Sequence, residues 1–260
     1  MSSELVRIAR KGDVLVWTLN RPEALNAFNR PLLKALRATA DAARDDRSVR
    51  CAIITGAGER AFSAGADLKE RRGMSIDETC LFVDLIGTTF DAVARLPFPT
   101  IAAVNGVAFG GGMELLLACD LRVLVDSAQI GLTEVSVGIM PGAGGTQRLP
   151  RIVGTTRAKE LILSARRLSA QEAHEMGVAN RVVARDELMQ TAQALAERIA
   201  QQAPLAVRQA KHAIDAGLDT SLAAGLQIEA AAYAELLHTQ DRVEGLTAFA
   251  EKRTPQYRGE

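Results

Sequence analysis

Two glutamates, twenty positions apart in glycine-rich sequence, are the residues of this chain best suited to moving protons. Glu114 ends the run FGGGME at 109–114, Glu134 ends GLTE at 131–134, and PGAGG follows at 141–145. Glycine lets the backbone approach a bound group closely, and a carboxyl group can take up or deliver a proton. One carboxylate beside a backbone cradle supports isomerisation, whereas two support the addition or removal of water.

Both glutamates have apolar neighbours, with leucines at 115–117 after the first and Val135, Val137 and Ile139 beside the second. Apolar surroundings raise the pKa of a carboxyl group, so that it can exchange protons near neutral pH. Each residue also has a plainer interpretation. Glu114 favours the dipole at the start of a helix opened by the glycines, and Glu134 is an ordinary surface acid.

Two small-residue segments offer backbone N–H groups to a ligand. Residues 61–69 (AFSAGADLK) follow an expected strand at 51–54, and the triple glycine at 110–112 follows an expected strand at 100–104 and opens a helix. The N–H groups at a helix start have no partner within the helix. Two N–H groups from different loops, directed at one carbonyl oxygen, would form an oxyanion hole. Either cluster alone is also typical of a tight turn, and neither has the spacing of a dinucleotide or P-loop motif.

The elements that position these residues alternate in the first half of the chain. Apolar runs predict strands at 14–19, 51–55, 100–104 and 121–125, and helical patterns lie near 30–45, 76–95 and 112–118. Nearly continuous apolar runs are typical of a sheet covered on both faces. The alternation therefore predicts an α/β fold with crossover connections.

The second half is predicted to be almost wholly helical. A capping box at 169–172 (SAQE) precedes a helix that Gly177 ends, and an apolar stripe is formed by Leu188, Ala192, Leu195 and Ile199. Pro204 and Gly217 suit the start and end of the next helix, and a further helix at roughly 220–239 precedes a charged tail at 251–253. We expect a core over 1–195 and a C-terminal helical region over 196–260 that packs on the core or on a neighbouring subunit.

Composition excludes several classes of protein. The 260 residues are 48% hydrophobic, enough for one large domain, and the 31 basic residues balance the 31 acidic ones, so no basic field attracts nucleic acid or a membrane surface. The N-terminal MSSE has no targeting pattern and no apolar run could span a bilayer, so we expect a cytoplasmic protein without membrane contact. Cys51, Cys80 and Cys119 match no zinc or disulfide spacing, so we expect reduced thiols and no metal. The three histidines lie in expected helices without a nucleophile nearby and receive no catalytic role.

An ordered set of motifs resembles the crotonase family, the enoyl-CoA hydratase/isomerase superfamily, over nearly the whole chain. The motifs are NRPEALNA at 20–27, AGAD at 64–67, AVNG at 103–106, GGGME at 110–114 and GIMPGAGGTQRLP at 138–150. The resemblance implies repeated ββα units that spiral into two roughly perpendicular sheets. It also implies a C-terminal helical region that mediates homo-trimers, usually paired into hexamers.

The resemblance assigns roles by position. Ala66 and Gly111 match the two oxyanion-hole N–H donors for a thioester carbonyl. The segment with Ala64, Ala66, Asp67 and Leu68 resembles the surface on which coenzyme A lies, and Lys69 and the Lys252 of a neighbouring subunit are candidates for the CoA phosphates.

Both glutamate positions of the true hydratases are occupied, whereas many family members with other reactions lack one. We therefore expect a lyase that adds water in syn fashion to a short- or medium-chain trans-2-enoyl-CoA, in fatty-acid β-oxidation or in amino-acid or aromatic catabolism. Glu114 would activate the water that attacks C3, and Glu134 would supply the proton to C2, with the two acting as a coupled pair. No cofactor is implied, because coenzyme A is part of the substrate.

A narrower resemblance is to the methylglutaconyl-CoA hydratases, through AGADLKER at 64–71, AKELILSAR at 158–166 and the tail EKRTPQYRGE at 251–260. Some of those enzymes bind AU-rich RNA through a lysine-rich helix. The matching helix at 30–47 has Lys34 as its one lysine and three aspartates, so nucleic-acid binding is not expected. A methylglutaconyl-CoA hydratase, a crotonase-fold isomerase, decarboxylase or thioesterase, and an RNA-binding protein are the alternatives.

The acyl specificity is left open. An apolar series in the segment 71–95 lines either the acyl end of the pocket or the core, and Arg71 or Arg72 either pairs with a distal carboxylate or is a solvated surface charge. The series consists of Met74, Phe82, Leu85, Ile86 and Phe90.

Overall fold

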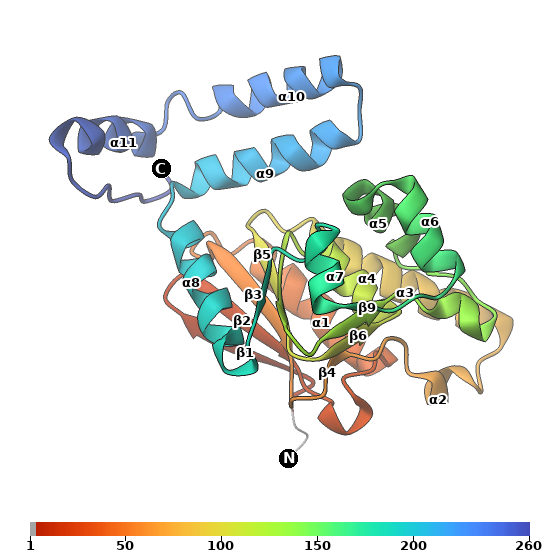
Figure 1. Cartoon of the computed structure of the whole chain (residues 1–260). Helices are drawn as coiled ribbons and strands as arrows, with labels where there is room; N and C mark the ends of the chain where they lie inside the picture. Colours follow the sequence, from red (N-terminus) through yellow and green to blue (C-terminus); the bar gives the residue numbers. More distant parts are fainter. Residues whose placement is uncertain (1–3) are drawn as a thin grey trace.

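The computed structural model describes residues 4–260, and its strands form two sheets (Figure 1). Within the described residues, the larger sheet contains, in spatial order, β1 (Val6–Lys11), β2 (Val14–Leu19), β3 (Cys51–Gly56), β5 (Thr100–Val104), β7 (Leu121–Val125) and β10 (Arg181–Val183). The smaller sheet contains β4 (Ala61–Ser63), β6 (Val107–Phe109), β8 (Gln129–Gly131) and β9 (Leu168–Ser169). Pairs along both sheets are parallel, except that β1 runs antiparallel to β2 and β9 to β8.

The helices follow the strands in a repeating order. The α-helices are α1 (Arg30–Arg44), α2 (Leu68–Arg71), α3 (Ile76–Ala94), α4 (Gly111–Ala118), α5 (Gly145–Val153), α6 (Thr155–Leu163), α7 (Ala170–Glu175), α8 (Leu188–Ala200), α9 (Pro204–Leu218), α10 (Leu222–Ala234) and α11 (Gln240–Glu251). Short 3-10 helices are η1 (Pro22–Ala24), η2 (Glu134–Val137) and η3 (Arg185–Glu187). In three successive units, a strand of the larger sheet is followed by one of the smaller sheet and then by helix. The expected ββα repeat is therefore confirmed.

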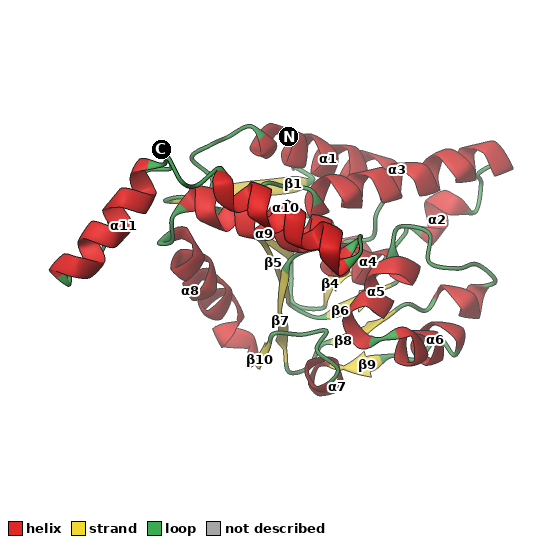
Figure 2. Ribbon diagram, turned by 90° about the horizontal axis from the view of Figure 1, so that it is seen from above, coloured by secondary structure: helices red, strands yellow, loops and turns green. Residues whose placement is uncertain are grey.

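The core lies on both faces of the larger sheet. Every residue of β3 and β5 is buried, which agrees with their continuous apolar sequence. Helix α8 covers one face, against β2, β3, β5 and β7, while α1, α3, α4 and the smaller sheet lie on the other side (Figure 2). Phe28 and Phe90 meet edge to face there, with ring centroids 5.2 Å apart.

This layering sets the place of the two glycine-rich segments. Strands β4 and β6 are parallel neighbours in the smaller sheet, so the loops after them emerge at the same edge. The loop after β4 leads to α2, and the turn after β6 opens α4. The two segments expected to supply backbone N–H groups are therefore adjacent.

The C-terminal helices lie apart from the sheets. Helices α9 and α10 run side by side in opposite directions beside the core, and α11 extends beyond them (Figure 1). Residue 195, the expected boundary of the core, lies within α8, which packs on the larger sheet, and the chain leaves the core only after Ala200. Of the apolar residues in α9 to α11, many have side chains that are mostly exposed: Ile214, Leu218, Leu222, Leu226, Tyr233, Val243, Leu246 and Phe249.

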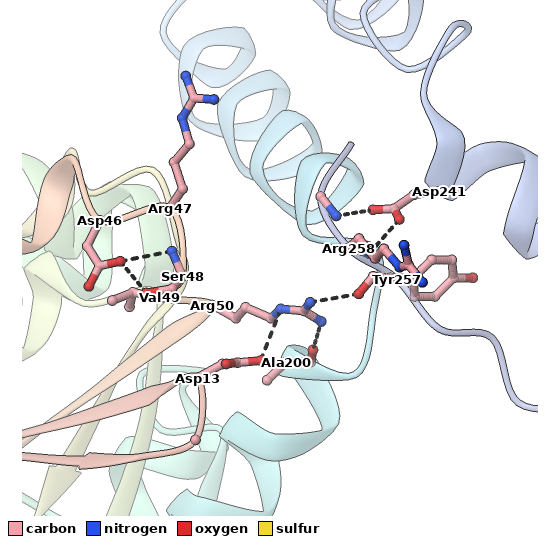
Figure 3. Close-up of polar contacts among 12 residues, drawn as sticks. Asp13, Asp46, Arg47, Ser48, Val49, Arg50, Ala200, Asp241, Tyr257 and Arg258 are labelled. Carbon is pink, nitrogen blue, oxygen red and sulfur yellow. Dashed lines mark hydrogen bonds and ion pairs between the residues drawn. The ribbon is translucent and has the colours of Figure 1, made fainter.

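Polar contacts join this region to the core and fix its C-terminal end. The Arg50 guanidinium donates to the carbonyls of Ala200 and Tyr257, both at 2.8 Å, and lies 3.2 Å from the Asp13 carboxylate (Figure 3). Asp241 accepts the N–H groups of Arg258 and Gly259, which fixes the C-terminal end beside α11 (Figure 3). The C-terminal segment after α11 therefore folds back onto the junction between α8 and α9.

Helix boundaries agree with the sequence in most of the chain. The Ser169 capping box forms, and Gly177 has a φ of +78°, in the left-handed region that favours glycine. The helix expected at 220–239 was wrong at its end, because it stops at Ala234, and α11 was not expected at all. The large apolar side chains of α11 face away from the core of this chain. Its sequence therefore lacks the periodic apolar residues that indicate a helix packed on a core. None of the helices in residues 4–260 combines the length and apolar character that a bilayer crossing requires.

Candidate active site

Glu114 lies buried in the first turn of α4, with 3% of its surface exposed. One carboxylate oxygen, Oε1, accepts the N–H groups of Ala143 at 2.7 Å and Gly145 at 2.9 Å. Burial raises the pKa of Glu114, while the two N–H donors and the nearby Arg148 oppose that rise. Oε1 is therefore fixed by backbone, and the other oxygen is left for a ligand.

The glycines before Glu114 are needed where the helix meets the smaller sheet. A Cβ on Gly112 would lie 2.1 Å from the carbonyl oxygen of Ser63 in β4, so no other residue fits without moving the backbone. Gly110 has a φ of +51°, which also favours glycine. The sequence GGG thus brings the start of α4 directly against the end of β4.

Glu134 opens η2 and places its side chain over Gly110. A Cβ on Gly110 would lie 3.4 Å from Glu134 Oε1, which places the carboxyl group in contact distance of the glycine that precedes α4. Its Oε2 is buried and finds no hydrogen-bond partner among residues 4–260. Burial raises the pKa of Glu134 to about 7, and the negative charge of Glu114 adds to the effect. A buried polar atom without a hydrogen-bond partner is rare in a folded protein.

The two carboxyl groups differ in the form that their surroundings favour. Glu114 accepts two N–H donors, which stabilise its anion, whereas Glu134 has an unpartnered buried oxygen, which favours its protonated form. Because the two groups interact, their titrations belong to the pair. The geometry therefore places a carboxyl group whose anion is stabilised by two N–H donors beside one whose protonated form is favoured by burial.

Two backbone N–H groups lie next to this pair. Phe28 N–H donates to Gly65 O at 2.8 Å and Asp67 N–H donates to Phe28 O at 2.9 Å, so that the N–H of the intervening Ala66 points away from Phe28. Gly111 is the first residue of α4, where N–H groups have no partner within the helix. Neither N–H donates to an acceptor in the described part of the chain.

The close approach of the two loops is visible at their glycines. A Cβ on Gly65 would lie 3.2 Å from Gly111 N, and a Cβ on Gly111 would lie 3.7 Å from Ala66 N. The N–H donors of Ala66 and Gly111 therefore adjoin, from different ββα units, as an oxyanion hole requires.

Protein groups surround the Asp67 side chain, and a contact of this residue with coenzyme A stays a prediction. Its carboxylate accepts the N–H groups of Lys69 and Glu70 at the start of α2 and pairs with Arg21 at 3.1 Å. Both side chains of that pair are mostly buried, with 16% and 14% exposed. The Asp67 side chain therefore holds the loop that carries Ala66 and is occupied by protein partners.

The other residues expected to contact coenzyme A lie around this loop or far from it. Ala64 donates its N–H to Leu25 O at 3.0 Å, and Leu68 and Lys69 are exposed on α2. Lys252 is exposed at the end of α11, remote from α2 within one chain (Figure 1). Its contact with coenzyme A therefore stays a prediction about a neighbouring subunit.

The apolar series of the segment 71–95 is mainly core. Phe82 and Phe90 are fully buried and Ile86 is 6% exposed, while Met74 and Leu85 are partly buried against the core. Of the two interpretations that the sequence left open, core holds for the two phenylalanines, because the helical period turns them toward the interior of the protein.

Sequence reasoning gave no role to the residues that hold Glu114. The N–H donors at Ala143 and Gly145 belong to the PGAGG run, whose glycines signalled close backbone approach without saying to what. Arg148 was also missed, since one arginine in a helical turn carries no distinct signal. In residues 4–260, His, Cys, Asp and Glu side chains do not gather in threes as a metal site would need.

Comparison with known proteins gives the family of the chain. The family model described as enoyl-CoA hydratase/isomerase matches residues 9–260. The human mitochondrial enoyl-CoA hydratase domain-containing protein 2 is 49% identical over 245 residues, 93% of this chain and 84% of that protein. Mouse mitochondrial methylglutaconyl-CoA hydratase is 47% identical over 251 residues, 95% of this chain and 80% of that protein.

A solved structure is similar over nearly the whole length. The crystal structure of an enoyl-CoA hydratase from Bacillus anthracis has a TM-score of 0.97 and 49% sequence identity, and the match covers 98% of this chain and 100% of that one. The resemblance drawn from the motifs is therefore confirmed, and the chain belongs to the enoyl-CoA hydratase/isomerase family of enzymes.

Proposed function

We propose that the protein is an enoyl-CoA hydratase, which adds water to the trans-2 double bond of a short- or medium-chain enoyl-CoA and gives the 3-hydroxyacyl-CoA. The observation that carries this proposal is the pair of unlike carboxyl groups beside two free backbone N–H donors. A single carboxyl group would suffice for isomerisation. A fixed anion with a neighbouring protonated acid suits the transfer of a hydroxyl group and a proton to adjacent carbons.

In the proposed reaction, the N–H groups of Ala66 and Gly111 bind the thioester carbonyl oxygen. Their dipoles stabilise the negative charge that this oxygen gains as C3 is attacked, an effect worth roughly 3–4 kcal/mol for each donor. Electron density moves from the C2–C3 double bond toward the carbonyl, which makes C3 electrophilic. The electrophile is therefore the conjugated thioester itself, polarised by the two backbone N–H groups.

The glutamates complete the balance of atoms. Glu114 takes a proton from the water whose oxygen forms the new bond to C3, and Glu134 gives its proton to C2. The substrate gains one water, and proton exchange between the coupled acids and solvent restores the starting state. Because Oε1 of Glu114 is held by Ala143 and Gly145, its other oxygen is the one that faces the water.

Binding of the CoA part is proposed on the loop between β4 and α2. The backbone at Ala64, Ala66 and Leu68 runs beside the two N–H donors, and Lys69 is exposed next to it. A neighbouring subunit would supply Lys252 for the phosphates. The exposed apolar side chains of α9 to α11 support a homo-trimer, or a hexamer of two trimers. Single apolar residues scattered over a surface are normal, whereas many of them on neighbouring helices are typical of a subunit interface. The pathway and a cytoplasmic location stay predictions.

The test is the reaction of purified protein with crotonyl-CoA. Loss of the ultraviolet absorbance of the conjugated thioester, with a product heavier by one water, is the expected result. Release of free coenzyme A or a product of unchanged mass would overturn the proposal in favour of a thioesterase or an isomerase.

A methylglutaconyl-CoA hydratase is the second candidate, favoured by the identity to the mouse enzyme of that name and by Arg71, which is half-buried on α2 near the proposed CoA surface. A guanidinium there suits a distal carboxylate. The measurement is kcat/KM for crotonyl-, longer enoyl- and methylglutaconyl-CoA, with Arg71→Gln as the variant and Arg72→Gln as its exposed control. A selective loss on methylglutaconyl-CoA in R71Q would support this candidate, and equal activity on all substrates would contradict it.

RNA binding finds little support on α1. Arg37 and Arg44 both pair with Asp41, at 2.7 and 3.4 Å, so two of the basic side chains of this helix have an acidic partner. Filter binding with AU-rich RNA at physiological salt is expected to show no retention at micromolar protein. Tight, salt-sensitive retention would contradict this.

A further inference from the structure

Arg148 folds back over the loop that holds Glu114. It belongs to the first turn of α5, and its guanidinium lies above Gly144, where a Cβ would be only 2.1 Å from Nη1. Gly144 also has a φ of +104°, in the left-handed region. Glycine at 144 therefore does two things: it permits the turn, and it leaves the space that the guanidinium fills.

The contacts of Arg148 lead to Glu114 through one residue. Its Nη1 donates to the carbonyl oxygen of Ala143 at 3.0 Å, and the N–H of Ala143 donates to Glu114 Oε1 at 2.7 Å. Its Nη2 lies 3.7 Å from the Asp91 carboxylate on α3, and 23% of its side chain is exposed. Arg148 and Glu114 thus both bond to the backbone of Ala143, one at its carbonyl oxygen and the other at its N–H.

We propose that Arg148 is a positioning residue, which fixes the loop 143–145 so that its N–H groups hold Glu114 ionised and directed at the reacting water. This inference rests on the proposed function, because it takes Glu114 as the group that activates water. Arg148 itself is directed at protein atoms, and it acts only through the loop and through its charge.

The charges around Glu114 give this inference a pH signature. Glu114 is faced by the positive Arg148 from α5 and by Glu134 from η2, and Arg148 is in turn faced by Asp91 and Arg95 from α3 and by Cys119 at the end of α4. Arg148 lowers the pKa of Glu114 against the effect of burial. Removal of the Arg148 charge is therefore expected to raise the pKa of Glu114. Glu114 would then take up its proton at a higher pH than in wild type.

The experiment compares R148Q and R148K with R151Q in the full-length protein, by kcat, KM and the pH profile of crotonyl-CoA hydration. Arg151 is the matched control, since it lies on the same helix with 56% of its side chain exposed and pairs with Asp219 at 3.3 Å. For R148Q we expect kcat to fall about 10- to 100-fold with little change in KM, because small displacements of a reacting group have effects of that size. The acidic limb of its kcat/KM profile is expected about one pH unit higher.

R148K separates charge from geometry. It keeps the positive charge but lacks the planar fork, so its acidic limb is expected near that of wild type while kcat stays lowered. R151Q is expected to match wild type in both respects. A folded R148Q with kcat within twofold of wild type and an unmoved acidic limb would overturn the inference. Should R148Q not fold, an unchanged kcat in R148K would overturn it equally.

A second readout separates this inference from the proposed function. Infrared difference spectra, with the signal of Glu114 assigned by its loss in E114Q, follow the ionisation of this carboxyl group without substrate. If wild type does not hydrate any enoyl-CoA, the proposed function fails. The positioning role would still stand if the Glu114 titration moved to higher pH in R148Q and not in R151Q, and it would fail if the titration did not move.

Discussion

Replacement of Glu134 by glutamine is predicted to make the protein more stable at alkaline pH although it removes the proposed proton donor. The reason is the unpartnered, buried Oε2 of Glu134 and the raised pKa that follows from burial. In the folded protein, ionisation of Glu134 as the pH rises is unfavourable, because burial and the negative charge of Glu114 disfavour its anion. In the unfolded chain, the same carboxyl group ionises freely in water.

The sign and size follow from linkage. A carboxyl group whose pKa rises on folding contributes stability that is present below the unfolded value and is lost as the pH rises through the folded value. Here the window runs from 4.5 to about 7. At 1.36 kcal/mol for each pH unit, ionising Glu134 costs the folded state about 3 kcal/mol as an upper limit. Because Glu134 is only partly buried, solvent screening reduces this to about 1–2 kcal/mol.

The assay is thermal unfolding of wild type, E134Q and the exposed-site control E23Q at equal protein concentration, between pH 5 and pH 8. A gain of about 1–2 kcal/mol corresponds to a rise in Tm of roughly 2–6 °C for a domain of this size. E134Q is expected to differ little from wild type at pH 5 and to exceed it by that amount at pH 8, with E23Q unchanged throughout. An advantage of E134Q that is no larger at pH 8 than at pH 5 would refute the reasoning.

Three further predictions follow from the site and from the C-terminal helices. The pH profile of kcat/KM should be bell-shaped, falling in acid as Glu114 takes up a proton and falling above about pH 7 as Glu134 loses its own; a profile that keeps rising through pH 9 would contradict the assignment of Glu134 as the acid. Gly65→Ala should reduce the rate of hydration about 100-fold or more, because its Cβ would lie 2.7 Å from Phe109 O and 3.2 Å from Gly111 N and would push the two N–H donors apart. Steady-state kinetics on variant protein of unchanged assembly mass check this, and activity near that of wild type would argue against the oxyanion hole. Phe249→Asp, at a side chain that is 86% exposed, should shift the protein toward monomers in sedimentation velocity, whereas exposed Glu175→Gln should not; an unchanged assembly in the first variant would exclude this face from the interface.

Much of the proposed catalytic arrangement could be predicted from the sequence, although its residues lie far apart along the chain. Ala66 and Gly111 each stand in a small-residue segment after an apolar strand, and parallel pairing of β4 with β6 brings those segments together. Glu114 and Glu134 were identified from their glycines and apolar neighbours, and the same features account for their raised pKa values. The roles of these four residues in catalysis stay predictions until kinetics test them.

What the sequence could not show are contacts that depend on how loops fold back. The loop that donates to Glu114 lies 29 and 31 positions beyond it, and Arg148 reaches that loop only because Gly144 leaves space for its guanidinium. The ion pair between Asp67 and Arg21, 46 positions earlier, could likewise not be read from the sequence. Helix α11 was missed for a related reason, since its large apolar side chains are exposed and form no stripe that faces the core.

The most direct test of the central claim is the rate of crotonyl-CoA hydration by wild type, E114Q and E134Q, each shown to be folded by circular dichroism. Two positioned carboxyl groups that act as base and acid predict that each variant loses activity by about a thousandfold, since general acid–base catalysis contributes factors of roughly 10² to 10⁴. Turnover near that of wild type in either variant would contradict the account.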